Sequence, residues 1–365
     1  MSAMMRAAVF VEPGRIEVVD KKIPDVGPND ALVRITTTTI CGTDIHILKG
    51  EYAVEKGLTV GHEPVGVIEK LGSAVHGYQE GQRVIAGAIC PNFHSYAAQD
   101  GVPSQDGSYL NPKNACGCHG YHATAGWRFG NKIDGTQAEY VLVPDAQANL
   151  APVPDGLTDE QVLMCPDIMS TGFKGAENAH IKIGDTVVIF AQGPIGLCAT
   201  AGARLLGATT IIAVDGNEHR LGIARQMGAD VTLNFKNCDV VEEVMKLTRG
   251  KGADSSIEAL GLQQTFESAL RVLKPGGTLS SLGVYSEDLT IPVDAFAAGL
   301  GDHKILTALC PGGKERMRRL MEVIDSGRVD LGLLVTHEYK LDDIVAAYDL
   351  FANQRDGVLK IAVKP

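Results

Sequence analysis

The sequence predicts an α/β protein in two parts: a β-rich region in the first half and a doubly wound parallel sheet after it. Up to about residue 165, short runs rich in Val, Ile and Thr are broken by Gly and Pro, which is typical of β-strands. From about residue 183, apolar strands alternate with helical patterns, which favours a parallel sheet covered on both faces. The 365 residues are enough for two domains with separate cores.

The first half contains a series of candidate strands, each bounded by turn-forming residues. They are residues 5–10, 15–24, 31–40, 64–72, 82–89 and 138–144. The stretch 91–136 between the last two has little periodicity, so we expect a long irregular excursion there. Excursions of this length are usually functional or form interfaces.

The second half alternates candidate strands with candidate helices. The strands are expected at 185–191, 209–215, 231–235, 253–260 and 278–284. The helices are expected at 194–207, 217–228, 240–250 and 262–273. Two helical patterns, 314–329 and 342–355, and a strand at 358–363 follow.

Composition and charge argue against several classes of function. The 33 Lys and Arg against 44 Asp and Glu give a net charge of −11, which makes a nucleic-acid surface unfavourable. No apolar run reaches the ~20 residues that cross a bilayer, and the first residues lack the apolar stretch of a signal peptide. The eight cysteines are scattered, unlike those of a secreted disulfide scaffold. We therefore expect a cytoplasmic protein whose cysteines are buried thiols or metal ligands.

A glycine-containing turn, "AQGPIG" at 191–196, follows the first strand of the second half. The dinucleotide-binding fingerprint G-x-G-x-x-G would place Gly at 191, 193 and 196, and Ala191 takes the first position. Gly193 would let the backbone approach a pyrophosphate at the helix N-terminus, and Gly196 would allow close helix–strand packing. Pro194 suits a first helical position. Taken alone, the turn could equally be a plain tight turn.

Asp215 closes the next strand, 22 residues after Gly193. An acidic residue there accepts hydrogen bonds from the adenosine ribose of NAD and would repel the 2′-phosphate of NADP. The alternative is a helix cap or a turn residue. Within the surrounding strand–helix–strand frame, the two signals together predict a Rossmann domain that binds NAD.

A possible metal site is spread over three stretches of the first half. "TTICGTDIHILKG" (38–50) and "VGHEPVG" (60–66) supply Cys41 and His62, which are good zinc ligands, and Glu63 follows directly. A lone Cys or His is more often a core residue. Cys165 and Asp167, which lie two positions apart ahead of the nucleotide-binding unit, strengthen the prediction of a metal site. From the residues alone, either of these two could be the next ligand.

With "CGTDIH", "GHEPVG" and "AQGPIGL" in this order and spacing, the chain resembles the zinc-dependent medium-chain alcohol dehydrogenases over essentially its whole length. "PDIMSTGFKGAE", "TAGWRFGN", "VTLNFKN", "VMKLTRGKG" and "LCPGG" are most similar to the tetrameric bacterial secondary-alcohol dehydrogenases. The resemblance implies a GroES-like catalytic domain formed by 1–170 and 310–365, a Rossmann domain at 171–309, and a homotetramer.

The resemblance also implies which side chains hold one catalytic zinc ion per chain. Counting back from Thr171-Gly172, the position that is an aspartate in this subgroup is Asp167, so the implied ligands are Cys41, His62 and Asp167. Glu63 would be a fourth, exchangeable ligand. Cys165 falls outside the ligand position and is expected to be a packed thiol.

Three further sets of residues are implied by the resemblance. Thr43 and His46 match a proton relay, although by themselves they could be a strand-end residue and a surface helix residue. Asp44 matches an acid that orients the histidine ligand. The apolar substrate pocket would include Ile89, Trp127, Thr171 and Leu309. Contacts to the cofactor would come from Gln192, Gly193, Pro194, Ile195, Gly196, Asp215, Asn217, Phe235, Leu282, Gly283 and Val284.

Two departures from relatives refine the expectation. A structural zinc lobe needs four closely spaced cysteines, but here Cys90 is followed only by Cys116 and Cys118, so we expect a single zinc. Well-known members of the subgroup prefer NADP and carry a small residue and then a basic one where this chain has Asp215-Gly216-Asn217, and Tyr where it has Phe235. This difference predicts that the chain uses NAD rather than NADP as its coenzyme.

The expected function is the reversible oxidation of small, mainly secondary alcohols to ketones or aldehydes, by zinc-assisted hydride transfer to NAD. A polyol, amino-alcohol or aldehyde dehydrogenase of the same superfamily is the alternative among enzymes. A non-enzymatic NAD-binding relative is the alternative from another class, and it would be expected to have lost ligand or relay residues.

Overall fold

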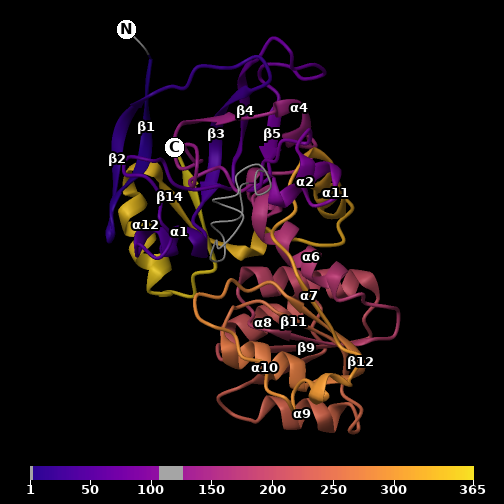
Figure 1. The fold of residues 1–365 in the computed structure, drawn as a ribbon. Coiled ribbons are helices and arrows are strands. Elements are labelled where there is room, and N and C mark those ends of the chain that lie inside the picture. The colour runs from indigo at the N-terminus through magenta and orange to yellow at the C-terminus, as the bar shows by residue number, and fades with distance from the viewer. Residues whose placement is uncertain (1–2, 107–125) are drawn as a thin grey trace. The chain divides into compact units, whose positions relative to one another are not determined.

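The computed structural model describes residues 3–106 and 126–365 (Figure 1). The chain divides into two compact units, each described here by itself. The first unit consists of Met1–Ser170 and Cys310–Pro365, and the second of Thr171–Leu309. Over the described residues, no helix has the length and apolar character needed to cross a membrane.

The first unit is built on a seven-stranded sheet with the order β14-β15-β3-β4-β5-β7, in which β6 also pairs with β3. Its strands are β3 (Ala31–Thr39), β4 (Val65–Leu71), β5 (Arg83–Ala86), β6 (Tyr140–Val143), β7 (Leu150–Pro152), β14 (Val335–Lys340) and β15 (Lys360–Lys364). A separate antiparallel pair is formed by β1 (Met4–Glu12) and β2 (Arg15–Lys22). Val33, Ile35, Ile68 and Leu150 bury their side chains in one cluster, so alternation along the strands creates the core as expected.

The helices of this unit are short, and several lie at strand ends. They are α1 (Gly42–Leu48), α2 (Tyr96–Gln99), α4 (Ala146–Asn149), α5 (Asp159–Val162), α11 (Lys314–Asp325) and α12 (Ile344–Ala352). A π-helix, η3 (Cys165–Met169), leads into α6 (Ser170–Asn178), which belongs to the second unit from Thr171 onward. Where it is described, the excursion expected at 91–136 has no helix or strand longer than the four residues of α2, and Cys116 and Cys118 lie outside the described residues.

The second unit is a six-stranded parallel sheet with the order β10-β9-β8-β11-β12-β13. Its strands are β8 (Thr186–Phe190), β9 (Thr210–Asp215), β10 (Val231–Asn234), β11 (Ala253–Glu258), β12 (Leu273–Ser281) and β13 (Lys304–Thr307). Helices α7 (Pro194–Leu206), α8 (Glu218–Gln226), α9 (Val240–Leu247) and α10 (Gln263–Arg271) connect the strands and lie on both faces of the sheet (Figure 1). The strand order reverses between β8 and β11, where ligands of such sheets bind outside the carboxyl ends of the strands. The predicted α/β fold class is confirmed.

Some elements differ from the sequence-based expectation. The "KPGG" segment, expected as a turn before a strand at 278–284, is part of β12, which begins at Leu273. Strands β7, β13 and β14 were not expected. Each lies at the edge of its sheet. No residue of β13 or β14 is buried, and β7 has only three residues, so the apolar signal is weak in all three.

Candidate metal and nucleotide sites

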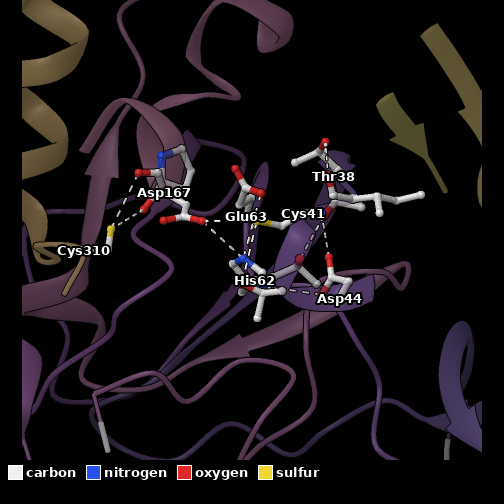
Figure 2. A network of polar contacts seen from close by, with 12 residues as sticks. Thr38, Cys41, Asp44, His62, Glu63, Asp167 and Cys310 are labelled. Carbon is white, nitrogen blue, oxygen red and sulfur yellow. Dashed lines mark hydrogen bonds and ion pairs between the residues drawn. The ribbon is translucent and has the colours of Figure 1, made fainter. Parts of the chain in front are cut away.

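Four side chains of the types that bind metal ions meet in the first unit: Cys41, His62, Glu63 and Asp167 (Figure 2). One ligand atom from each lies within 4.8 Å of all the others. The Asp167 Oδ2 atom is 3.5 Å from both Cys41 Sγ and His62 Nε2, and Glu63 Oε1 is 4.0 Å from His62 Nε2. Asp167 is half-buried and the other three are buried. We call these four residues the ligand cluster.

The local fold positions each member of the ligand cluster. Cys41 lies two residues after the end of β3 and caps α1, and its backbone N–H donates to Asp44 Oδ2 at 2.8 Å. His62 and Glu63 precede β4, after Gly61, whose φ of +89° favours glycine. A Cβ at that position would also lie 2.6 Å from Gln137 Cγ. Asp167 lies within the π-helix η3, a rare turn that is frequent at functional sites.

Cys165 lies in the same π-helix but outside the ligand cluster. Its Sγ atom is 3.8 Å from Met169 Sδ and is fully buried, and burial raises the pKa of this thiol. On the other side of the turn, Cys310 Sγ is 3.7 Å from the carbonyl oxygens of Pro166 and Asp167 (Figure 2). The carboxylate of Asp167 therefore reaches the ligand cluster, whereas the thiol of Cys165 packs in the core.

Asp44 connects the histidine of the cluster to a buried polar chain. Its Oδ1 atom faces His62 Nδ1 at 3.5 Å, and its Oδ2 atom accepts a hydrogen bond from Gln137 Nε2 at 3.3 Å. Gln137 Oε1 in turn accepts from the Tyr348 hydroxyl at 2.9 Å. Burial opposes the charged form of His62, but Asp44 and Asp167 prevail and raise its pKa well above 6.5. The cluster thus favours a positive charge in its midst.

Thr43 and His46 follow Cys41 on helix α1, three positions apart and therefore on one helical face. The hydroxyl of Thr43 is 3.9 Å from Cys41 Sγ. His46 is more exposed, pairs through Nδ1 with Glu51, and stacks on Tyr52 with ring centroids 4.7 Å apart. The helix thus carries a hydroxyl beside the cluster and an imidazole nearer to solvent.

Of the four expected pocket residues, two lie in the first unit. Trp127 is buried with its ring edge-on to His62, at a centroid distance of 6.2 Å. Ile89 is buried against Gly126, the neighbour of Trp127. Thr171 and Leu309 are the first and last residues of the second unit.

The turn between β8 and α7 has the geometry of a phosphate-binding loop. Ala191 has a φ of +69°, so it adopts the backbone conformation of the glycine that it replaces. Gly193 caps α7, and a Cβ added there would meet nothing within 4 Å. A Cβ at Gly196 would lie 1.8 Å from the carbonyl oxygen of Ala191. Pro194 and Ile195 form the first helical positions. The backbone is thus open at Gly193, where a pyrophosphate would approach, and closely packed at Gly196, where the helix meets the loop.

The Gln192 side chain is directed inward rather than toward a ligand. It is fully buried, donates to the Ile189 carbonyl oxygen at 3.1 Å and accepts from the Thr200 hydroxyl at 3.0 Å. Only the backbone of Gln192 takes part in the loop, because its N–H donates to Asp215 Oδ2 at 2.6 Å.

Asp215 ends β9 beside this loop, and its Oδ1 atom accepts a hydrogen bond from the Asn217 N–H at 2.9 Å. Asn217 caps α8. Phe235 is exposed and packs on Gly216, where a Cβ would lie 2.5 Å from its ring. Leu282, Gly283 and Val284 follow β12. The expected cofactor residues therefore gather at the carboxyl-terminal edge of the parallel sheet.

Comparisons with known proteins agree with this geometry. Residues 27–155 match the family model described as alcohol dehydrogenase GroES-like domain, and residues 194–326 match the zinc-binding dehydrogenase model. An alcohol dehydrogenase of Cupriavidus necator is 85% identical over 365 residues, covering all of both chains. The chain belongs to the zinc-binding alcohol dehydrogenase family. Within that family, the NADP-dependent isopropanol dehydrogenase of Thermoanaerobacter brockii is 36% identical, with 98% of this chain and 99% of that one covered.

Solved structures of zinc-binding alcohol dehydrogenases share the fold along the whole chain. The alcohol dehydrogenase TADH from Thermus sp. ATN1 superposes with a TM-score of 0.85 at 29% identity, covering 99% of each chain. The zinc-dependent alcohol dehydrogenase 2 of a Streptococcus species gives a TM-score of 0.86 at 29% identity, covering 99% of this chain and 98% of that one.

The ligand cluster of this family member fits a zinc ion. Four ligands at 2.0–2.3 Å around a tetrahedral ion stand roughly 3.3–3.8 Å apart, close to the separations of 3.5–4.0 Å found here. Thiolate, imidazole and carboxylate are zinc's usual donors. Asp44 faces the histidine nitrogen that points away from the cluster, the arrangement that commonly orients a zinc-bound histidine.

One residue of this site was missed by sequence reasoning. Lys360 on β15 is buried, and its Nζ atom is 2.6 Å from Glu63 Oε1 and 3.2 Å from the carbonyl oxygen of Ile40. Burial alone would lower its pKa, but Glu63 and Cys41 raise it, so the ammonium keeps its charge. The available signal was a single lysine within the apolar strand pattern "VLKIAV".

Proposed function

We propose that this chain reversibly oxidises small, mainly secondary alcohols to ketones or aldehydes, with NAD as the hydride acceptor. The observation that carries the proposal is the cluster of Cys41, His62 and Asp167, two of them buried and the third half-buried, in a chain that also contains a Rossmann-like parallel sheet. Relatives that are 36% identical are named isopropanol dehydrogenases, which supports a small secondary alcohol as the substrate.

In this proposal Cys41, His62 and Asp167 hold the zinc ion and Glu63 is the exchangeable fourth ligand. Zinc, when bound, would supply a Lewis acid that polarises the oxygen of an alcohol or carbonyl compound. The protein would hold the ligand atoms in place by burying Cys41 and His62 and by placing Asp44 beside His62. A bound nicotinamide would accept the hydride of the alcohol carbon.

The proton released in the reaction needs a path out of a buried site. We assign it to Thr43, whose hydroxyl lies beside Cys41, and then to His46, whose imidazole is half-exposed and paired with Glu51. A hydroxyl can both accept and donate a hydrogen bond, and an imidazole can take up a proton on one ring nitrogen and release one from the other, so the pair suits a relay.

The pocket residues support an apolar substrate. Trp127 and Ile89 are buried in the first unit, and Trp127 lies against His62. We assign Thr171 and Leu309 to the same pocket as proposals. Such walls favour short aliphatic chains over polyols, whose hydroxyls would lose hydrogen bonds to water.

NAD is proposed over NADP because of the charge at the end of β9. Asp215 is followed by Gly216 and Asn217, so a carboxylate rather than a cation stands where the adenosine ribose would approach. Several relatives are named NADP-dependent, so the proposed use of NAD would distinguish this chain from those relatives.

An alcohol panel tests the proposal. The zinc-loaded protein is given 2-propanol, 2-butanol, 1-propanol, glycerol and an amino alcohol with NAD or NADP, and reduced coenzyme is followed by absorbance. We expect the highest kcat/KM for the secondary alcohols, loss of turnover after chelation, and recovery when zinc is restored. Faster turnover of glycerol or the amino alcohol would show that the proposed substrate class is wrong. No turnover of any alcohol would refute the proposed activity.

Further proposals concern the chain as a whole. We propose that the first unit is the GroES-like catalytic domain and the second the Rossmann domain, with one zinc per chain in a homotetramer. We also propose a cytoplasmic location, because the described cysteines form no disulfide with one another.

A further inference from the structure

We propose that Lys360 is a positioning residue of the metal site, whose ammonium restrains Glu63 and so sets how readily zinc is released. The inference rests on the proposed zinc site but concerns a residue that the proposed function does not use. It assigns to Glu63 two competing partners, the lysine and the metal ion.

The carboxylate oxygen of Glu63 that binds Lys360 is also the one that faces another member of the ligand cluster. Glu63 Oε1 accepts from Lys360 Nζ at 2.6 Å and is also the oxygen that lies 4.0 Å from His62 Nε2. The other oxygen, Oε2, is buried without a hydrogen-bond partner among the described residues. The ammonium of Lys360 thus restrains the carboxylate of Glu63 through one oxygen, while the other oxygen has no partner in the described part of the chain that would hold it.

Lys360 is itself firmly placed. Its strand pairs with β3, where Ala362 is opposite Thr39 and Val363 is opposite Thr38. Its second hydrogen bond goes to the carbonyl oxygen of Ile40, the residue before Cys41. The ammonium is thus held against the backbone that precedes Cys41 as well as against Glu63.

Charge balance gives the lysine a specific role. With Cys41 as thiolate, the ligand cluster carries three negative side chains, and zinc supplies two positive charges. The ammonium of Lys360 offsets the remaining charge within a region from which water is largely excluded. Without the ammonium of Lys360, the carboxylate of Glu63 would lack a compensating charge, and the nearest cation would be a bound zinc ion.

A purely structural ion pair is the competing explanation. Replacing buried ion pairs by apolar groups of similar volume is often neutral or stabilising, so stability alone gives little reason for a lysine in this strand. A structural pair would change the unfolding temperature when altered, but it would leave the rate of zinc release unchanged. That rate therefore separates the two explanations.

The experiment compares Lys360→Met, Lys360→Gln and Lys360→Arg in the full chain. Zinc release is timed with an excess of a chromogenic chelator, and coordination is followed by the visible absorption of the cobalt-substituted protein. We expect Lys360→Met to slow release by at least about tenfold, because the freed carboxylate stays on the metal. Lys360→Gln keeps a donor without charge and should slow release less, whereas Lys360→Arg should match the unmodified protein.

Adding Glu63→Gln to Lys360→Met should abolish the slowing and return the cobalt spectrum toward that of Glu63→Gln alone. Unchanged or faster release from Lys360→Met, with an unchanged cobalt spectrum, would overturn the proposal. If Lys360→Met does not fold, equal release rates for the Gln and Arg variants would overturn it instead.

Zinc content and turnover of the unmodified chain are measured first. A chain that binds zinc and turns over alcohols while its Lys360 variants release zinc normally would refute this inference alone. A chain that binds no zinc would refute both this inference and the proposed function.

Discussion

Asp167 and Cys165 stand two positions apart in one π-helix, yet only Asp167 reaches the ligand cluster. In a helical turn, residues two apart face different directions, so one points toward the metal ligands and the other into the core. The thiol of Cys165 contacts Met169 and is sealed from solvent. Side-chain direction, rather than chemical suitability, therefore separates the two candidate ligands.

The first prediction uses this pair. Asp167→Ala should lose most of its bound zinc and its activity, because the ligand that touches both Cys41 and His62 is removed. Cys165→Ala serves as the matched control and should keep both, at a cost of roughly 1 kcal/mol for the small cavity it leaves. Atomic absorption and thermal unfolding measure the two effects, and zinc loss from the Cys165 variant instead would reverse the assignment.

The second prediction concerns Asp215 and the coenzyme. Hydrogen bonds from ribose hydroxyls to a carboxylate contribute roughly 1.5–3 kcal/mol each, and a 2′-phosphate removes one and adds about −1.5 to −2 charge. We therefore expect kcat/KM to favour NAD over NADP by at least about tenfold. Asp215→Asn, which removes the charge and keeps one acceptor oxygen, should narrow that preference.

Asp230→Asn is the control for this measurement. Asp230 also accepts a backbone hydrogen bond, from Ile211 at 2.8 Å, but it precedes β10 at the opposite end of the sheet. The coenzyme ratio should not change in this variant. Equal kcat/KM for NAD and NADP in the unmodified protein would contradict the proposed role of Asp215 in coenzyme selection. It would not bear on the fold.

At the scale of elements, the loop between β8 and α7 shows how a departure from a motif is accommodated. Ala191 holds a positive φ without being glycine, because its N–H donates to the Val214 carbonyl oxygen at 2.9 Å and Gly196 packs closely against its own carbonyl. The surrounding contacts therefore fix a conformation that the residue alone would avoid.

The third prediction separates packing from binding in this loop. Gly196→Ala should lower the free energy of unfolding by at least about 2 kcal/mol, because its Cβ would overlap the Ala191 carbonyl oxygen. Gly193→Ala should leave stability nearly unchanged, since a Cβ there meets nothing. It should nevertheless weaken NAD binding at least about tenfold, because the methyl group occupies the approach of the pyrophosphate.

Thermal unfolding and coenzyme titration are run on both glycine variants. Normal NAD binding by Gly193→Ala would show that the pyrophosphate does not approach this turn. A Gly196→Ala protein as stable as the unmodified one would show that the loop can shift to admit a side chain.

At the scale of the whole molecule, the two units differ in how much of their structure the sequence predicts. Strands β8 and β9 of the second unit are largely buried, so Val188 and Ile212 lie in nearly continuous apolar runs that are easy to recognise. The ligand cluster could be named because "CGTDIH" and "GHEPVG" are local motifs. The contact between Lys360 and Glu63 joins residues 297 positions apart, and no local pattern encodes such a pairing.

The fourth prediction is the oligomeric state. We expect light scattering to give about four times the chain mass of 38.7 kDa. Near β13, the edge strand of the second unit, apolar side chains are exposed, which is typical of a surface covered in an assembly. They include Leu289, Ile291, Val293 and Leu300.

Leu300→Lys should lower the mass without affecting folding, because this side chain is 85% exposed. Ile183→Lys is the control, since Ile183 is 91% exposed but lies before β8, away from β13 in the chain. A monomeric mass for the unmodified chain would remove the tetramer from the proposal.

The insertion of the second unit within the first also affects the order of events during biosynthesis. Ribosomes deliver a chain from its N-terminus, so the strands β3 and β4 emerge long before β15, and all of Thr171–Leu309 is made in between. Until β15 arrives, Thr38 and Thr39 lack their strand partners Val363 and Ala362, and the nascent sheet has an open edge that invites aggregation. The second unit is continuous and can fold as one piece, whereas the first can close, and gain its buried lysine, only after the whole second unit has been made.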